Sequence, residues 1–424
     1  MHSLNTALMD TTPRPRRPEL DWLRVIVFGL LILYHIGMVY VENWGYHVKS
    51  AYRSDTLDSV MLLVNQWRLP ILWFISGVAM RYAVAKFPLM HFIRLRSLRL
   101  LLPLLFGILV IVPPQLFVEM SSKGDIALDY WAFYRAFFDL DNPLFEKYTP
   151  GILPHMDVNH LWYLRELWTF SLVILLLSPI LHMRHVTNAV HWLCLQQSHL
   201  LFLLAIISPF VLMQLLMQAS REQEGFGYLL LGYLLAYESS FWQRIARTGK
   251  HYALAAMLCY GLIVMAYQTL WQDSVVHTDW RLLLPLMLIA QLNIWCWILA
   301  LFAFAARYLN RHSSGLAYLN QAVLPYYILH QSFIVVYAYL LAQWQLGSVL
   351  EPSVLIILTI SSCALTYEGI RRIRWLRPLF GLSWHTRADP TAPEHNGRVQ
   401  QQLWRFACVL TYLALIPFGL KILL

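Results

Sequence analysis

The sequence predicts an all-α, polytopic transmembrane bundle of about 10–11 helices. Of the 424 residues, 58% are hydrophobic and only 13% are charged, and the mean hydropathy is +0.52. This balance lies well outside that of soluble domains. Apolar stretches of about 20 residues, the length that crosses a bilayer, recur from Asp21 to the last residue. They are continuous rather than alternating, which disfavours a transmembrane β-barrel.

The apolar stretches define the expected helices in chain order. They cover residues 20–42, 57–82, 97–118, 162–183, 197–217, 225–241, 251–270, 281–306, 321–344, 353–370 and 403–424. The chain then divides into a basic N-terminal arm (1–19), a membrane domain (20–382), a polar cytoplasmic linker (383–402) and an extra C-terminal helix (403–424). The arm is polar and ends in a basic cluster, a pattern that does not predict a cleavable signal peptide.

Charge in the loops predicts the orientation. Lys and Arg gather in alternate loops, at Arg14, Arg16 and Arg17, Arg81 and Lys86, Arg244 and Arg247, and Arg371 and Arg372. The positive-inside rule places these loops and the N-terminus in the cytoplasm. The long loop 119–161 is instead rich in Asp, aromatic residues and proline, and we expect it to form a folded exoplasmic cap.

The cysteine spacing and the placement of the net charge argue against a metal site, a disulfide framework and nucleic-acid binding. The five cysteines stand singly without Cys-x-x-Cys spacing, so we expect neither a metal site nor a disulfide framework. The net charge of +9 lies largely in loops beside apolar helices. It therefore indicates orientation in a membrane, with lipids as neighbours, rather than binding to nucleic acid.

The first helix carries ionisable residues at both ends of the apolar run RVIVFGLLILYH, which begins at Arg24 and closes at His35. At about 100° per residue the two side chains share one wall of the helix, about 16 Å apart along its axis. Asp21 lies one turn before Arg24 and is placed to pair with it. His35 lies deep in the span, where an ionisable group is costly and usually faces an interior cavity.

Other helices repeat this anomaly. Arg68 lies about ten residues into the second helix, and His330 lies near mid-depth in the ninth. His160 stands at the start of the fourth helix, with Glu166 further in. A structural histidine bonded to a neighbouring helix explains any one of these residues, but explains all of them together less well.

Arg94, Arg96 and Arg99 stand at the cytoplasmic start of the third helix. Arginine forks suit phosphate oxygens, so this cluster is a candidate site for a phosphorylated ligand. Positive-inside anchoring is the alternative explanation. Glu368, at the cytoplasmic end of the tenth helix, is a candidate counter-charge for these arginines.

These residues together resemble the acyltransferase 3 family of integral-membrane acyltransferases. The similarity rests on the Arg24 and His35 pair, RLPILWFISG in the second helix, the RSLR motif, HLWYL at the fourth helix and YYILHQSF in the ninth. It covers about residues 19 to 380. LLPLLFGILVIVPPQ and YEGIRRIRWLRPLF look most like the branch that includes the succinyltransferase for periplasmic glucans.

The resemblance implies transfer of an acyl group, acetyl or succinyl, from cytoplasmic acyl-coenzyme A to a hydroxyl of a glycan beyond a bacterial inner membrane. Carried over by position, His35 and Arg24 match the family's essential pair, and Arg96 and Arg99 match the arginine motif thought to serve the donor. Arg68, His160 and His330 match recurrent positions, whereas Glu166 has no dependable counterpart.

The expected mechanism uses His35 as a general base, with Arg68 or His330 stabilising the oxyanion. A transient acyl-histidine is the alternative route. His160 and Glu166 are expected to contact the acceptor, and no metal is needed. From another class, a proton-coupled exporter of lipid or glycan would also use buried ionisable residues. A glycosyltransferase using a lipid-linked sugar is a third possibility. The sequence does not predict the oligomeric state.

Overall fold

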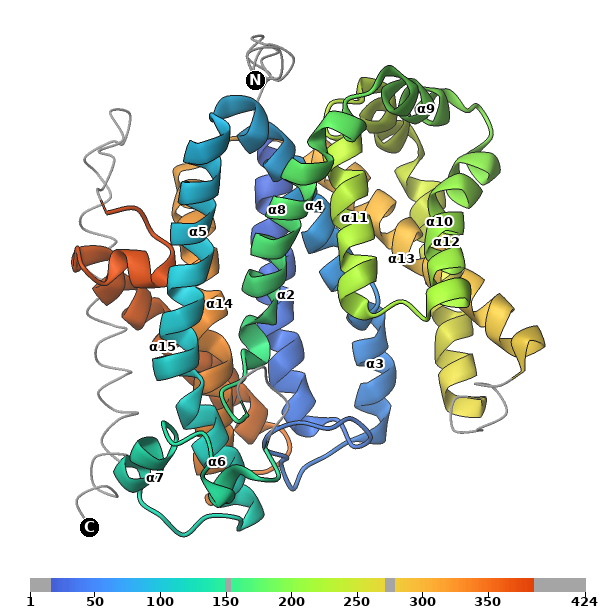
Figure 1. Ribbon diagram of the computed structural model, residues 1–424. Coiled ribbons are helices and arrows are strands. Elements are labelled where there is room, and N and C mark those ends of the chain that lie inside the picture. Colours follow the sequence, from blue (N-terminus) through green and yellow to red (C-terminus); the bar gives the residue numbers. More distant parts are fainter. Residues whose placement is uncertain (1–16, 149–153, 271–278, 385–424) are drawn as a thin grey trace. The chain divides into compact units, whose positions relative to one another are not determined.

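The structure is a computed structural model that describes residues 17–148, 154–270 and 279–384. Within those ranges the regular secondary structure is helical, and an isolated β-bridge joins Val41 and Ser54. The helices, shown in Figure 1, are α2 (Pro18–Tyr40), α3 (Asp55–Asn65), α4 (Arg68–Lys86), α5 (Leu89–Phe106), α6 (Pro113–Lys123), α7 (Tyr130–Ala136), α8 (Trp162–Leu181), α9 (Arg184–Leu195), α10 (His199–Met217), α11 (Arg221–Leu235), α12 (Ser239–Thr269), α13 (Trp280–Tyr308), α14 (Ser314–Leu341) and α15 (Leu350–Arg372). A π-helical turn, η1 (Gly107–Ile111), joins α5 to α6, and 3-10 turns lie at η2 (Pro143–Phe145), η3 (Asn159–Leu161) and η5 (Arg377–Phe380).

In the part of the chain that the structure describes, nine helical segments are long and apolar enough to cross a membrane. They are α2, Asp55–Lys86, Leu89–Lys123, Asn159–Leu181, α10, α12, α13, α14 and α15. The prediction of an all-α, polytopic bundle is confirmed. The extra helix expected over 403–424 lies outside the described residues, as do most of the arm and the linker.

Several predicted boundaries differ from the structure, and two of the differences bear on the site or on the expected spans. The sixth apolar stretch corresponds to α11, which has 15 residues and starts early because Ser220 and Gln223 form a capping box. The third stretch continues past residue 118, so Glu119 belongs to α6 and not to the cap. That helix ends where Gly124 adopts a left-handed φ of 74°, a conformation that favours glycine. The polar residues of the last turn of α6 made it resemble a loop.

The described helices form two compact units. One contains residues 17–30, 59–93 and 169–316, and the other contains residues 31–58, 94–168 and 317–384. In the first unit α4 packs directly against α11, as Figure 1 shows. A Cβ atom added to Gly77 would lie 1.9 Å from the carbonyl oxygen of Leu229, and one added to Gly232 would lie 2.1 Å from that of Phe74. Close backbone approach at small residues is a main source of helix association in membranes.

The glycine contact allows a stability prediction. Gly77→Val should lower the thermal unfolding midpoint in detergent, because the obstructing atoms belong to the backbone of α11 and overpacking costs about 1–3 kcal/mol or more. Gly261→Ala on α12 is the matched control: its added Cβ meets nothing within 4 Å, and alanine favours a helix by about 1 kcal/mol over glycine. Equal midpoints for the two variants would contradict the packing argument.

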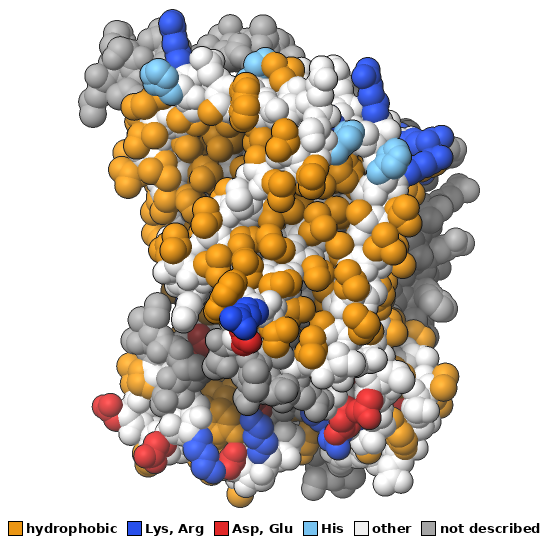
Figure 2. Space-filling model, turned by 90° about the vertical axis from the view of Figure 1, so that its right-hand side faces the viewer, with side chains coloured by type: hydrophobic (Ala, Val, Ile, Leu, Met, Phe, Trp, Pro, Cys, Tyr) orange, Lys and Arg blue, Asp and Glu red, His pale blue; other side chains and the backbone are white. Residues whose placement is uncertain are grey.

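Apolar side chains cover the face of the first unit that α10 and α12 present in Figure 2. Exposed leucines on these two helices include Leu200, Leu204, Leu212, Leu254, Leu258 and Leu262. An exposed apolar surface of this extent is unusual for a soluble monomer and is typical of a surface that faces lipid.

The second unit contains the region after α6 that the sequence predicts as a cap. Its core is a cluster of buried side chains, Met120, Phe133, Phe137 and Phe145. Asp129 caps α7 by accepting hydrogen bonds from two backbone N–H groups of its first turn. Asp125 accepts hydrogen bonds from Lys147 and from the Tyr148 hydroxyl, and these bonds lower the pKa of its carboxyl group.

Candidate active site

Three consecutive residues of α14, His330, Gln331 and Ser332, connect the elements of the second unit. Their side chains leave the helix at successive angles of about 100°. Each therefore reaches a different partner: His330 meets α2, Gln331 meets the segment after α2 and η3, and Ser332 meets η1 and α6. The run HQS is thus the hub of a polar cluster inside a membrane-spanning helix.

His35 and His330 form a hydrogen-bonded pair whose tautomers follow from their partners. His330 Nδ1 lies 2.8 Å from the carbonyl oxygen of Tyr327 and 3.1 Å from that of Tyr326, so it carries the proton and donates it. His330 Nε2 must then accept, and it lies 2.9 Å from His35 Nδ1. His35 therefore donates from Nδ1, which leaves its Nε2 as the basic nitrogen. The two rings are also stacked, with centroids 5.1 Å apart.

His160 is the third histidine of the cluster, and its ring lies edge-on to that of His330 at 5.5 Å. Its Nε2 donates to the carbonyl oxygen of Ile328 at 3.0 Å, and its Nδ1 accepts from Gln115 at 3.3 Å. Both nitrogens are therefore used by a neutral imidazole. Asn159, the residue before it, has a left-handed φ of 46°, which Asn tolerates better than most residues. His160 therefore lies beside the His35–His330 pair, but its hydrogen bonds hold it to Ile328 and Gln115.

The π-helical turn η1 prepares the docking of Ser332. In a continuous α-helix the Gln115 N–H would bond to the carbonyl of Ile111, but here it bonds to Val112 at 2.9 Å. The Ile111 carbonyl accepts instead from the Ser332 hydroxyl at 2.6 Å. Turns of this kind inside helices often mark functional sites.

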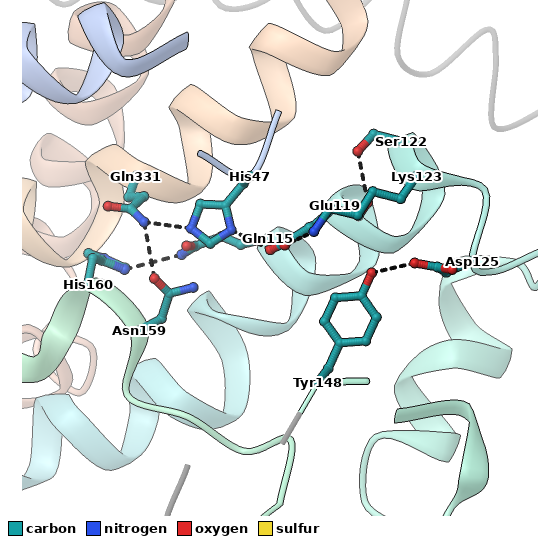
Figure 3. Close-up of polar contacts among 10 residues, drawn as sticks. All are labelled: His47, Gln115, Glu119, Ser122, Lys123, Asp125, Tyr148, Asn159, His160 and Gln331. Atoms are coloured by element: carbon teal, nitrogen blue, oxygen red, sulfur yellow. Dashed lines mark hydrogen bonds and ion pairs between the residues drawn. The ribbon is translucent and has the colours of Figure 1, made fainter. Parts of the chain in front are cut away.

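Gln331 joins the hub to a second imidazole, His47, in the segment 41–54 after α2. The Gln331 amide donates to His47 Nε2 at 3.0 Å and to Asn159 Oδ1 at 3.1 Å (Figure 3). His47 therefore carries its proton on Nδ1, 2.5 Å from Glu119 Oε2. The other carboxylate oxygen of Glu119 accepts from Lys123 at 2.5 Å. This arrangement is an imidazole–carboxylate pair anchored on α6.

The segment 41–54 is tied back to the helices at several points, which fixes His47. The Ser50 N–H bonds to the Val39 carbonyl at 3.0 Å, and the Ser50 hydroxyl donates to the buried carboxylate of Glu351 at 2.7 Å. Lys49 donates to the carbonyl of Met38 at 2.9 Å and also to that of Val41. Burial lowers the pKa of Lys49, and it raises the pKa of the neighbouring Tyr46.

The two other cations expected at the catalytic centre belong to the first unit. Arg24 pairs with Asp21 at 3.4 Å, which confirms the predicted contact, and its side chain is 30% exposed. Arg68 is buried, and its guanidinium donates to the backbone oxygen of Asn65 at 2.7 Å and to its side-chain oxygen at 2.5 Å. These bonds secure the break between α3 and α4.

The remaining predicted residues have mostly local contacts. Glu166 pairs with Arg165 at 2.7 Å, and no described contact joins it to the histidines. Glu368 accepts from Tyr318 at 2.8 Å and pairs with arginines of its own helix, Arg371 and Arg372. Arg94, Arg96 and Arg99 all lie in the first three turns of α5, where Arg94 and Arg99 are exposed and Arg96 is half-buried.

The sequence argument missed six members of the polar cluster: His47, Gln115, Glu119, Asn159, Gln331 and Ser332. Two of them carried a signal, since Gln331 directly follows His330 and Gln115 interrupts the apolar run VIVPPQLFV. His47 and Glu119 resembled ordinary polar residues near helix ends. In the described ranges no three His, Cys, Asp or Glu side chains are grouped to hold a metal ion.

The fold and the cluster define a multi-pass membrane protein with paired imidazoles inside its helices. Residues 17–368 match the acyltransferase domain of the acyltransferase 3 family. The chain belongs to this family.

Similar curated proteins include the glucans biosynthesis protein C of Salmonella typhi and of Salmonella typhimurium, each 28% identical over 156 residues. The protein of the same name from Salmonella paratyphi B is 27% identical over the same length. The matched stretch covers 37% of this chain and 37% of each of these relatives. No solved structure matches.

Proposed function

We propose that this enzyme moves an acetyl or succinyl group from cytoplasmic acyl-coenzyme A to a hydroxyl of a periplasmic or cell-surface glycan. The enzyme lies in a bacterial inner membrane with its N-terminus in the cytoplasm. Family membership supports acyl transfer, and the name of the Salmonella relatives supports a glucan-like acceptor. The positive loops support the orientation.

The observation that carries this proposal is the His35–His330 pair. His330 holds the Nδ1 proton of His35, so the lone pair of His35 Nε2 receives the proton of the acceptor hydroxyl. The acceptor oxygen attacks the thioester carbonyl carbon, and the carbon–sulfur bond then breaks. The leaving thiolate takes the proton back from His35 Nε2 and departs as the thiol. His35 takes up one proton and gives it back, so the imidazole is neutral again at the end of the reaction.

The tautomers also narrow the choice of oxyanion donor. His330 Nε2 accepts from His35, and His330 Nδ1–H is held by backbone carbonyls, so His330 has no N–H to offer an oxyanion. We therefore assign His330 to positioning His35, and not to stabilising the oxyanion.

The proposed reaction is tested with the purified full-length protein in nanodiscs. Labelled acetyl- or succinyl-coenzyme A is supplied with a neutral glucose oligosaccharide, and the ester product is identified by mass spectrometry. We expect ester formation with one of the two donors, which names the acyl group. No ester from either donor, together with proton-gradient-driven glycan flux in the absence of an acyl donor, would overturn the proposal in favour of an exporter.

The arginines of α5 carry a separate prediction about donor binding. Arg96→Ala should weaken acyl-coenzyme A binding roughly tenfold or more, the size of a lost charge-assisted hydrogen bond of about 1.5–3 kcal/mol. Binding is measured by calorimetry without an acceptor. Arg135→Ala removes the same charge from the exposed surface of α7 and should leave the affinity unchanged. Equal affinities in the two variants would refute a donor role for Arg96.

A further inference from the structure

Gln115 on α6 is fully buried and has one unsatisfied polar atom. Its amide nitrogen donates to His160 Nδ1 at 3.3 Å and to the Ser332 hydroxyl at 2.7 Å. Both partners must accept, because His160 donates from its other nitrogen and Ser332 donates to Ile111. The amide orientation is therefore fixed. Its carbonyl oxygen, Oε1, is buried with no hydrogen-bond partner in the described chain.

An orphaned buried acceptor needs an explanation, because leaving it unsatisfied costs about 1–3 kcal/mol. A bound group that donates a hydrogen bond would remove this cost. Gln115 lies among the residues that brace the His35–His330 pair, since it contacts both His160 and Ser332. A group that donates a hydrogen bond to Gln115 Oε1 would therefore come close to the His35–His330 pair.

Glu119 lies one helical turn beyond Gln115 on the same face of α6, since residues four apart are neighbours on a helix. Its side chain is 18% exposed, so this face runs from a buried amide to a carboxylate that solvent reaches (Figure 3). A carboxylate has about four acceptor sites. The described contacts of Glu119, to His47 and Lys123, use two of them.

Asn159 adds a third side chain to the set. Its Oδ1 accepts from Gln331, and no described residue accepts from its amide N–H groups. The three side chains together offer acceptors at Gln115 and Glu119 and a donor at Asn159. A sugar hydroxyl both donates and accepts, so it matches this combination, whereas an anionic group has no hydrogen to donate to the Gln115 and Glu119 oxygens.

We propose that the α6 face from Gln115 to Glu119, together with Asn159, is the acceptor subsite and that it selects neutral, polyhydroxylated acceptors. His47 and Gln331 position this subsite. The inference rests on the proposed acyltransferase function and adds the class of acceptor and the residues that hold it. The cationic cluster of α5 serves the anionic donor, so the two substrates are separated by charge.

Acceptor binding is tested first without catalysis. Calorimetry on the wild-type protein in nanodiscs uses a neutral maltooligosaccharide and, as the anionic probe, a galacturonic acid oligomer of equal length, with no acyl donor present. We expect the neutral oligomer to bind and Glu119→Gln to weaken that binding roughly tenfold, the size of one lost charge-assisted hydrogen bond. Tighter binding of the anionic oligomer, or unchanged affinity in the variant, would overturn the inference.

Kinetics then separate this role from a structural one. Glu119→Gln and Gln115→Met should each raise the KM for the oligosaccharide roughly tenfold while the KM for acyl-coenzyme A stays at the wild-type value. Ser122→Ala is the matched control on α6, because the described hydrogen bond of its hydroxyl goes to the backbone carbonyl of Glu119, and it should change neither constant. A parallel rise in both KM values would indicate a structural effect and overturn the inference. A wild-type protein that binds the neutral oligomer but transfers no acyl group would instead refute the proposed function.

Discussion

Replacing His35 with alanine is expected to lower kcat for acyl transfer by about 10²–10⁴-fold, the usual contribution of a general base. The reason is that His35 Nε2 is the nitrogen left unprotonated by the bonds from His35 to His330 and from His330 to the backbone. The measurement is the steady-state rate of ester formation at saturating donor. Acyl-coenzyme A affinity and the thermal midpoint should stay close to the wild-type values.

His185→Ala is the matched control, because it removes an exposed histidine on α9 and should retain full activity. Full activity in a well-folded His35→Ala protein would refute the assigned role of His35. The same preparation distinguishes direct transfer from an acyl-histidine. After incubation with labelled donor alone and rapid denaturation, label on the wild-type protein that is absent from His35→Ala would support the covalent route.

His330→Leu is expected to lower kcat about 10- to 100-fold, with little change in donor KM. The substitution removes the acceptor for His35 Nδ1–H and so releases the constraint that keeps the proton off Nε2. Leucine suits the fully buried site, and the carbonyls of Tyr326 and Tyr327 lie inside a helix that continues to satisfy them. The expected loss is therefore a loss of orientation rather than of folding.

His330→Gln separates these two causes. A glutamine oxygen is able to accept from His35 Nδ1, so this variant should recover part of the rate lost in His330→Leu. Both variants are compared by single-turnover kinetics and by thermal midpoint. Equal rates for the two variants at equal stability would contradict the positioning role.

Much of the fold could be predicted from the hydropathy and charge of short segments of the sequence. The bilayer requires about 20 apolar residues for each crossing, and that requirement located the segments that became α2, α8, α10 and α12 to α15. The cost of an ionisable group in a membrane also identified His35, His160 and His330 as a set, and the structure brings their rings together.

Hydropathy predicted helix ends less well where polar residues continue a helix beyond its apolar stretch. Glu119 and Lys123 in the last turn of α6 resembled a loop, because the helix leaves its apolar stretch before it ends. Glu166 resembled a site residue because it follows His160, yet its described partner is Arg165. Hydropathy measures the cost of burying a residue and does not identify the partner that offsets it.

The sequence by itself determined that this protein is helical and membrane-spanning, and which buried ionisable residues needed an explanation, because both properties depend on local composition. Only the tertiary structure decided which nitrogen of His35 is basic and that Gln115, His47 and Glu119 join the site. Tautomers and hydrogen-bond partners depend on atoms about 3 Å apart in space. In the His35–His330 pair those atoms come from residues that are 295 apart in sequence.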